Sequence, residues 1–178
     1  MDYIRTILIF IHLIVFAFAI TKLYKSDFNL FFKRPDRNEI KSMGSQMLLY
    51  LVILWISGLG VVYIDTGFAF EKIITAQKLI TKLSCVGVLT INALLVHFVA
   101  FKKLAKEKLV KADLSVMGVV GAISTASWSF AGFLGVAKPL VKHLSLADFL
   151  TLYCVVLLVA VVVAGFLTPR IAKNWNVQ

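Results

Sequence analysis

The chain alternates between long apolar stretches and short polar connections. A helix that crosses a bilayer needs about 20 mostly apolar residues, because the hydrocarbon core is about 30 Å thick and each helical residue rises about 1.5 Å. Five stretches reach that length, approximately residues 4–23, 46–64, 79–101, 114–136 and 149–167. A helix satisfies its own backbone hydrogen bonds in lipid, so we predict an all-α bundle of five transmembrane helices in a single integral membrane domain, residues 1–178.

Composition supports this interpretation. Hydrophobic residues make up 60% of the 178 residues and charged residues 16%, whereas a soluble domain has about 45–50% and about 25%. These values exclude a disordered chain and a small disulfide scaffold, and they argue against a soluble enzyme. The sequence also contains no Walker loop, GxGxxG, CxxCH or HExxH motif, so no catalytic role is assigned.

The charges predict an orientation. Nineteen Lys and Arg residues against nine Asp and Glu residues give a net charge of +10. The bases gather in the first and third connections, which we therefore place in the cytoplasm, with the N-terminus outside and the C-terminus inside a bacterial inner (plasma) membrane. We expect the bilayer as a partner and no nucleic acid. The bases of the first, third and fourth connections are Lys22, Lys25, Lys33, Arg34, Arg37, Lys41; Lys102, Lys103, Lys106, Lys108, Lys111; and Lys138, Lys142.

Three shorter features predict local structure. Apolar residues 28 and 30–32 lie among bases and predict a short interfacial helix before the proline that follows them. Pro139 and Pro169 predict helix boundaries. Cys85 and Cys154 each stand alone among apolar residues, which predicts buried thiols rather than a disulfide or a metal site.

Polar residues at membrane depth are the candidate functional residues, because they are costly in lipid and usually face the bundle interior. Counting about 1.5 Å per residue from the outer face, His12, Ser57 and Trp128 lie roughly 12 Å deep and Lys82 about 8 Å deep. Asp65 marks the outer rim. We expect these residues to form one site that opens outward.

Two further polar residues lie deeper. Asn92 falls beyond the midplane, and His97 lies near the cytoplasmic end of the third span. His12 and His97 are therefore roughly 15–20 Å apart in depth. Two axial ligands of one haem lie at a common level, so we expect these histidines to serve separate sites if both bind haem.

Each candidate also has a purely structural interpretation. His12 can hydrogen-bond a neighbouring helix, Lys82 can extend its ammonium group toward water, and His97 can be an interfacial residue. Trp128 can be a packing residue. The small side chains at four-residue spacing in the same span predict close helix contact there; they are Gly118, Ala122 and Ala126.

The first and third spans resemble a known family. Ile11-His12-Leu13, together with Lys82, Asn92, His97 and the Lys102-Lys103 pair, resembles the bacterial membrane-embedded protoporphyrinogen oxidases and, more loosely, copper-resistance-type membrane domains. The resemblance implies a bundle that binds haem b, with His12 and Lys82 at the positions that matter. The segments 54–58 and 124–128 resemble, more closely, small five-span bacterial membrane proteins with no assigned function.

Three functions follow as hypotheses. The first is binding of haem b or a porphyrin for redox or haem-related chemistry, with His12 as ligand to the haem iron, Lys82 as ligand, propionate partner or proton donor, and His97 as a further cofactor-binding candidate. The second is a non-catalytic subunit or assembly factor, with other membrane subunits or a second copy as partner. The third is a carrier of a small solute or ion that uses His12, Asp65 and Lys82.

Overall fold

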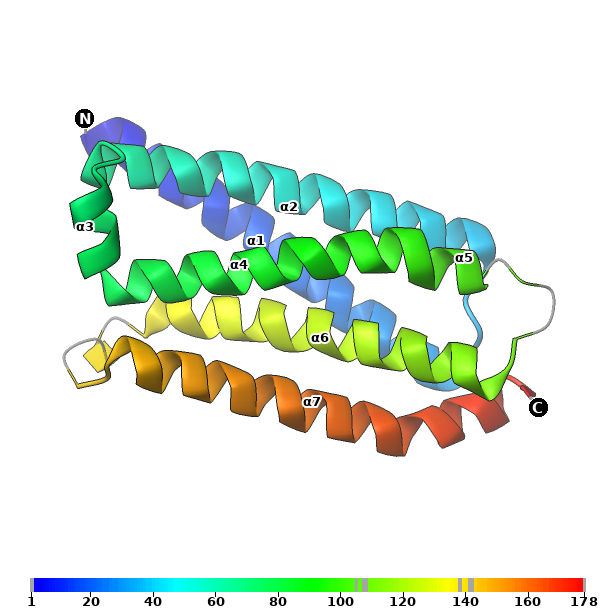
Figure 1. Ribbon diagram of the computed structural model, residues 1–178. Helices are drawn as coiled ribbons and strands as arrows, with labels where there is room; N and C mark the ends of the chain where they lie inside the picture. Colours follow the sequence, from blue (N-terminus) through cyan, green and yellow to red (C-terminus); the bar gives the residue numbers. More distant parts are fainter. Residues whose placement is uncertain (1, 105, 107–108, 138, 141–142, 178) are drawn as a thin grey trace.

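The structure, a computed structural model, describes residues 2–104, 106, 109–137, 139–140 and 143–177. Most of these residues are helical, and none of them lies in a strand (Figure 1). Five helices are long and apolar enough to cross a membrane, which confirms the predicted all-α bundle. The elements are α1 (Asp2–Phe32), α2 (Arg37–Thr66), α3 (Phe70–Thr75), α4 (Gln77–Leu95), the π-helical segment η1 (Val96–Ala100), α5 (Phe101–Leu104), α6 (Lys111–Val136) and α7 (Leu146–Asn174).

The long helices extend beyond the predicted spans. Helix α1 has 31 residues and is therefore about 46 Å long, more than the thickness of the hydrocarbon core. It runs through residues 28–32, so the separate interfacial helix predicted there was wrong. The helix ends just before Pro35, which disfavours helical geometry at the residue before it.

Two other local predictions need correction. Pro139 lies beyond the end of α6, as expected, but Pro169 lies inside α7, which continues to Asn174. Helices in membranes tolerate proline because neighbouring groups can satisfy the freed backbone carbonyl. Cys85 is buried as predicted, whereas Cys154 on α7 is exposed, because the helical turn points it away from the bundle.

The most extensive contacts pair α1 with α2, α6 with α7, and α4 with α6. Figure 1 shows α1 passing obliquely behind the layer formed by α2, α4 and α6. A central apolar cluster joins α1, α2, α4 and α6, and a second cluster joins α4, α6 and α7. The buried members of the central cluster are Ala19, Leu23, Leu51, Leu54, Leu89 and Trp128.

Glycines permit close approach between helices at several places. A Cβ atom on Gly132 of α6 would lie 2.9 Å from Cζ of Phe16 on α1, and one on Gly118 would lie 3.0 Å from Oγ1 of Thr168 on α7. The prediction of close helix contact at the small residues of the fourth span is therefore confirmed at Gly118.

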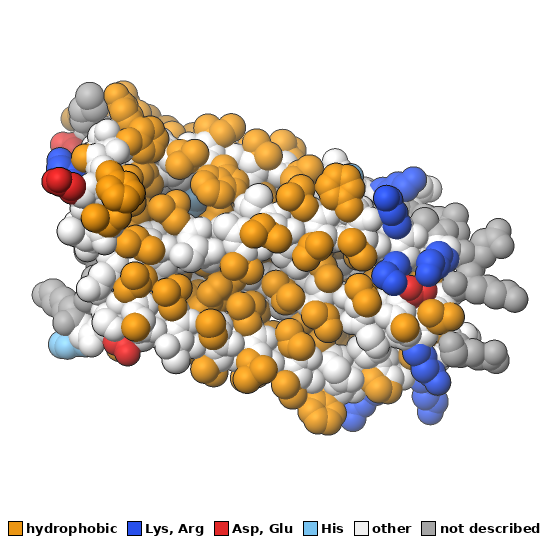
Figure 2. All heavy atoms as spheres, in the orientation of Figure 1, with side chains coloured by type: hydrophobic (Ala, Val, Ile, Leu, Met, Phe, Trp, Pro, Cys, Tyr) orange, Lys and Arg blue, Asp and Glu red, His pale blue; other side chains and the backbone are white. Residues whose placement is uncertain are grey.

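The surface separates apolar and charged side chains. Apolar side chains cover the length of the bundle, and lysines and arginines collect at one end of it (Figure 2). We call this the basic end, and its described lysines include Lys33, Lys102, Lys103, Lys106, Lys111 and Lys173. The predicted loop bases Lys108, Lys138 and Lys142 lie outside the described residues.

Candidate functional site

Two regions of the bundle contain polar side chains that can bind a ligand or a cofactor. The first lies toward the end opposite the basic end and includes His12. The ring nitrogen Nδ1 of His12 on α1 lies 2.9 Å from Oγ of Ser57 on α2. The Ser57 hydroxyl is buried and also lies 2.8 Å from the carbonyl oxygen of Ile53. The predicted common level of His12 and Ser57 is confirmed, because the two side chains are in hydrogen-bond contact.

Lys82 joins this region from α4. Its side chain is half-buried, and its ammonium group is close enough to His12 for the charge to act on the imidazole ring. No hydrogen bond or ion pair to Lys82 is present within the described part of the chain. The structure thus joins His12 to Ser57 by a hydrogen bond and places Lys82 nearby on α4, while the chemical roles of His12 and Lys82 stay predictions.

Trp128 and Asn92 have packing roles in the structure. The Trp128 ring is 3% exposed and its centroid lies 5.8 Å from that of Phe16, one helical turn beyond His12. The side-chain amide nitrogen of Asn92 donates to the carbonyl oxygen of Val120 at 3.0 Å and joins α4 to α6. The Asn92 side-chain oxygen is buried without a partner among the described residues.

A buried polar chain beside this region was not predicted. The Ser127 hydroxyl lies 2.7 Å from the Tyr153 hydroxyl, and the Cys85 thiol donates to the Ser127 carbonyl oxygen at 3.4 Å. These residues connect α6, α7 and α4. In the sequence each looks like an ordinary core residue, so the connection is visible only when the three helices are packed together.

Asp65 lies at the end opposite the basic end, as expected for the rim. Its two carboxylate oxygens accept hydrogen bonds from the Arg5 guanidinium at 2.6 and 3.1 Å. Both side chains are about 40% exposed, at 42% for Arg5 and 41% for Asp65. The pair therefore fastens α1 to α2 rather than joining His12 and Lys82 in one site.

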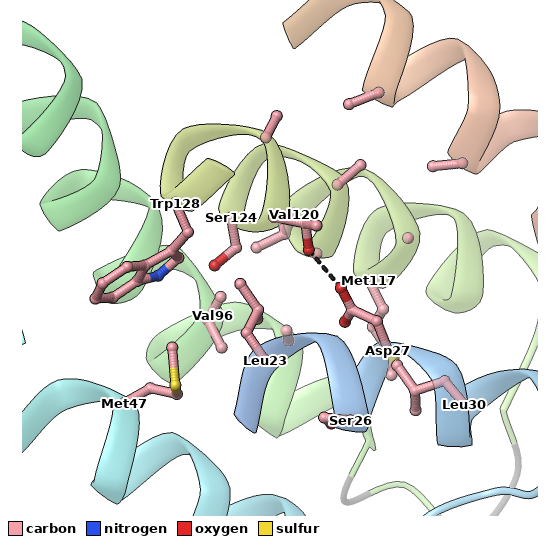
Figure 3. Close-up of a pocket in the computed structure, with 18 of the residues that line it drawn as sticks. Leu23, Ser26, Asp27, Leu30, Met47, Val96, Met117, Val120, Ser124 and Trp128 are labelled. Atoms are coloured by element: carbon pink, nitrogen blue, oxygen red, sulfur yellow. Dashed lines mark hydrogen bonds between the residues drawn. The ribbon is translucent and has the colours of Figure 1, made fainter. Parts of the chain in front are cut away.

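The second region is a cavity of about 940 Å³ in the half of the bundle toward the basic end. We call it the inner cavity. Its walls come from α1, α2, α4 with η1, α6 and α7, and most of its lining side chains are apolar (Figure 3). Representative lining residues are Leu23, Leu30, Met47, Leu51, Leu89, Val96, Met117, Val120, Trp128, Val159 and Trp175.

Asp27 is the acidic side chain that α1 places in this apolar wall. Its Oδ2 atom accepts a hydrogen bond of 2.5 Å from the Thr125 hydroxyl on α6, and Figure 3 shows the carboxylate directed from α1 toward α6. Leu23, Ser26, Asp27 and Leu30 all line the cavity. Their spacing of three, four and seven residues marks one helical face, a signal that the sequence does contain.

His97 also borders the inner cavity, from the π-helical segment η1. Such segments insert an extra residue into a helical turn and are frequent at functional sites. The His97 ring is exposed and packs edge-on against Phe98, with centroids 5.4 Å apart. His97 and His12 lie in different regions, which agrees with the predicted separation in depth.

The His12 region can offer a haem an imidazole ligand, but His12 does not line the inner cavity. With Nδ1 engaged by Ser57, Nε2 is the nitrogen left for iron. The inner cavity begins on α1 at Leu23, which is 23 − 12 = 11 residues or about 16 Å from His12. No three His, Cys, Asp or Glu side chains gather as a possible metal site in the described parts of the chain.

Comparisons with known proteins add no assignment. A comparison of the chain with models of protein families, with curated proteins and with solved structures finds no match. The assignment of function therefore depends on the geometry of the two regions.

Proposed function

We propose that this protein is a multi-pass membrane protein that binds a largely apolar small molecule inside its helical bundle, in the inner cavity. The volume of about 940 Å³ carries the proposal. Ligand sites are concave, mostly apolar and about 300–1,000 Å³ in volume, and in bundles they lie between helices.

The charge distribution supports an orientation for this site. Basic residues collect at one end of the bundle, and cytoplasmic loops of membrane proteins carry an excess of Lys and Arg. We place the basic end in the cytoplasm of a bacterial cell, with the five long helices in the inner membrane. The inner cavity then lies in the cytoplasmic half of the bilayer, where apolar molecules dissolved in lipid can reach the bundle.

Tryptophan quenching tests ligand binding. Trp128 and Trp175 line the cavity, so an ω-bromoundecanol molecule bound there quenches their fluorescence. In phosphatidylcholine nanodiscs, we expect a saturable component of quenching above the background from probe dissolved in the bilayer.

Two variants of α6 make the test specific. Gly121 lines the cavity and a Cβ atom there meets no other group within 4 Å, so Gly121→Leu directs a side chain into open space. Gly135 is equally open but does not line the cavity. We expect Gly121→Leu to remove the saturable component and Gly135→Leu to retain it. Equal quenching in the two variants would refute the proposed site.

Binding of haem b or a porphyrin at His12 is a second candidate function. The observation that favours it is the hydrogen bond between Nδ1 of His12 and the Ser57 hydroxyl oxygen, because a hydrogen bond at the second nitrogen orients an imidazole ligand. The test is an absorption spectrum of the purified protein after haem supplementation. A Soret band that is lost in His12→Ala and kept in His97→Ala supports it, and absence of the band in the unmodified protein refutes it.

A further inference from the structure

We propose that the inner cavity selects an amphiphile whose polar group is a primary ammonium, held by the Asp27 carboxylate. This inference rests on the proposed function, since it assigns the chemistry of the ligand in the same cavity. It adds one claim, that a single acidic side chain sets the preference for a cationic head group.

Among the described residues, only one of the two oxygens of the Asp27 carboxylate has a hydrogen-bond partner. One of its oxygens, Oδ2, accepts the Thr125 hydroxyl at 2.5 Å. No hydrogen bond reaches Oδ1, and no Lys, Arg or His forms an ion pair with Asp27, among the described residues. Figure 3 shows the carboxylate within the ring of labelled lining residues. A ligand in the cavity can therefore approach the unoccupied oxygen.

The other lining charges do not compensate Asp27. Lys33 and Glu39 also border the cavity, but they face each other, with Nζ of Lys33 3.9 Å from a carboxylate oxygen of Glu39. His97 borders the cavity as well and packs against Phe98. With Lys33 and Glu39 balanced, the carboxylate of Asp27 gives the wall an excess negative charge, which attracts a cation and repels an anionic head group.

The apolar surroundings make this charge selective. A carboxylate in an apolar site is unfavourable without a partner, and ionisable residues at membrane depth usually pair or mark a ligand path. A primary ammonium supplies three N–H donors and a positive charge, so it can bond the free oxygen while its alkyl body fills the apolar volume. Charge-assisted hydrogen bonds are roughly twice as strong as neutral ones.

Three bromoundecyl probes with the same chain test the inference in the nanodisc quenching experiment: an amine, an alcohol and a carboxylic acid. In the unmodified protein we expect the amine to bind about tenfold more tightly than the alcohol and the carboxylate to bind more weakly than both. Asp27→Asn keeps the shape of the side chain but removes its charge. We expect it to bring the affinities for amine and alcohol within about twofold of each other.

Glu71→Gln is the matched control. Glu71 is an exposed acid on α3, far from the cavity lining, so this variant changes the net charge equally and should keep the tenfold preference. Equal binding of amine and alcohol by the unmodified protein, or a preference that persists in Asp27→Asn, would overturn the inference while saturable alcohol binding upholds the proposed function. Absence of saturable binding by every probe would refute both. The ranking in the unmodified protein decides the matter even if Asp27→Asn does not fold.

Discussion

Polar side chains inside this bundle bind one another across helix boundaries. His12 meets Ser57, the Trp55 indole donates to the Thr90 hydroxyl at 3.0 Å, and Ser127 meets Tyr153. Hydrogen bonds between membrane helices contribute on average only about 0.6 kcal/mol each. These bonds instead define how two helices are arranged, because each bond can form at only one relative rotation and one relative height of its two helices.

The Ser127–Tyr153 pair allows this contribution to be measured. Both residues are buried, with exposures of 0% and 4%. We expect Tyr153→Phe and Ser127→Ala each to lower the free energy of unfolding by about 1 kcal/mol, because each leaves a buried hydroxyl or its site without a partner. A double-mutant cycle on reversible unfolding in detergent should give a coupling of about 0.6–1.7 kcal/mol. Strictly additive effects would show that the two hydroxyls do not interact.

At the residue scale, the sequence predicts the membrane depth of a polar residue better than it predicts the hydrogen-bond partner of that residue. Counting residues along two spans was enough to place His12 at the depth of Ser57, and the structure shows that the two side chains are in contact. Asp27 was missed because the first predicted span ended at residue 23 and the acid was included in a basic connection. Only when α1 continues to Phe32 does Asp27 share a face with Leu23 and Leu30. The Ser127–Tyr153 bond depends on the rotation of two helices, which hydropathy does not define.

At the scale of elements, the packing of α6 against Phe16 of α1 depends on the absence of a side chain at Gly132. Gly132→Ala would place Cβ 2.9 Å from the Phe16 ring, whereas Gly135→Ala on the same helix meets nothing within 4 Å. We expect Gly132→Ala to destabilise the protein by about 1–3 kcal/mol through overpacking. We expect Gly135→Ala to be neutral or stabilising by up to about 1 kcal/mol.

Thermal unfolding of the two alanine variants in the same detergent measures the difference. The melting temperature of Gly132→Ala should fall below that of the unmodified protein, and that of Gly135→Ala should not. Equal melting temperatures would mean that the Phe16 ring can move aside at no cost, and that the approach of the two helices is not set by Gly132.

Element types could be predicted from the sequence, but element ends could not. Apolar runs of about 20 residues require helices in lipid, and all five were found. Hydropathy marks where a helix leaves the hydrocarbon, not where its hydrogen bonds stop, so every predicted span was shorter than its helix or helical segment. The short helix α3 was missed because its six residues are too few to cross a bilayer.

At the scale of the whole molecule, charge separates the two ends of the bundle. The basic end is held together by buried charge as well, since the Asp113 side chain, 3% exposed, accepts from Lys103 at 2.7 Å and from Lys106 at 3.0 Å. These contacts fasten α5 and Lys106 to the start of α6. The lysines that predict topology therefore also shape the connection between two spans.

Cysteine labelling tests the orientation. With Cys154→Ala as background, Glu71→Cys places a thiol on α3 and Lys173→Cys places one at the basic end of α7. Both parent residues are exposed. We expect a membrane-impermeant maleimide to label Glu71→Cys in intact cells and Lys173→Cys only after the membrane is disrupted. The reverse pattern would place the basic end, and with it the inner cavity, on the outer side.

Helix α1 ends in an arrangement that bears on how the chain is made. The Phe31 and Leu30 carbonyl oxygens, which have no partner within α1, accept hydrogen bonds from the Asn174 side-chain amide at 2.5 Å and the Trp175 indole at 3.1 Å. These donors are synthesised more than 140 residues after the acceptors. We therefore expect the last turn of α1, which contributes to the wall of the inner cavity, to gain these partners only after α7 has been synthesised, so that the cavity is completed late in biogenesis.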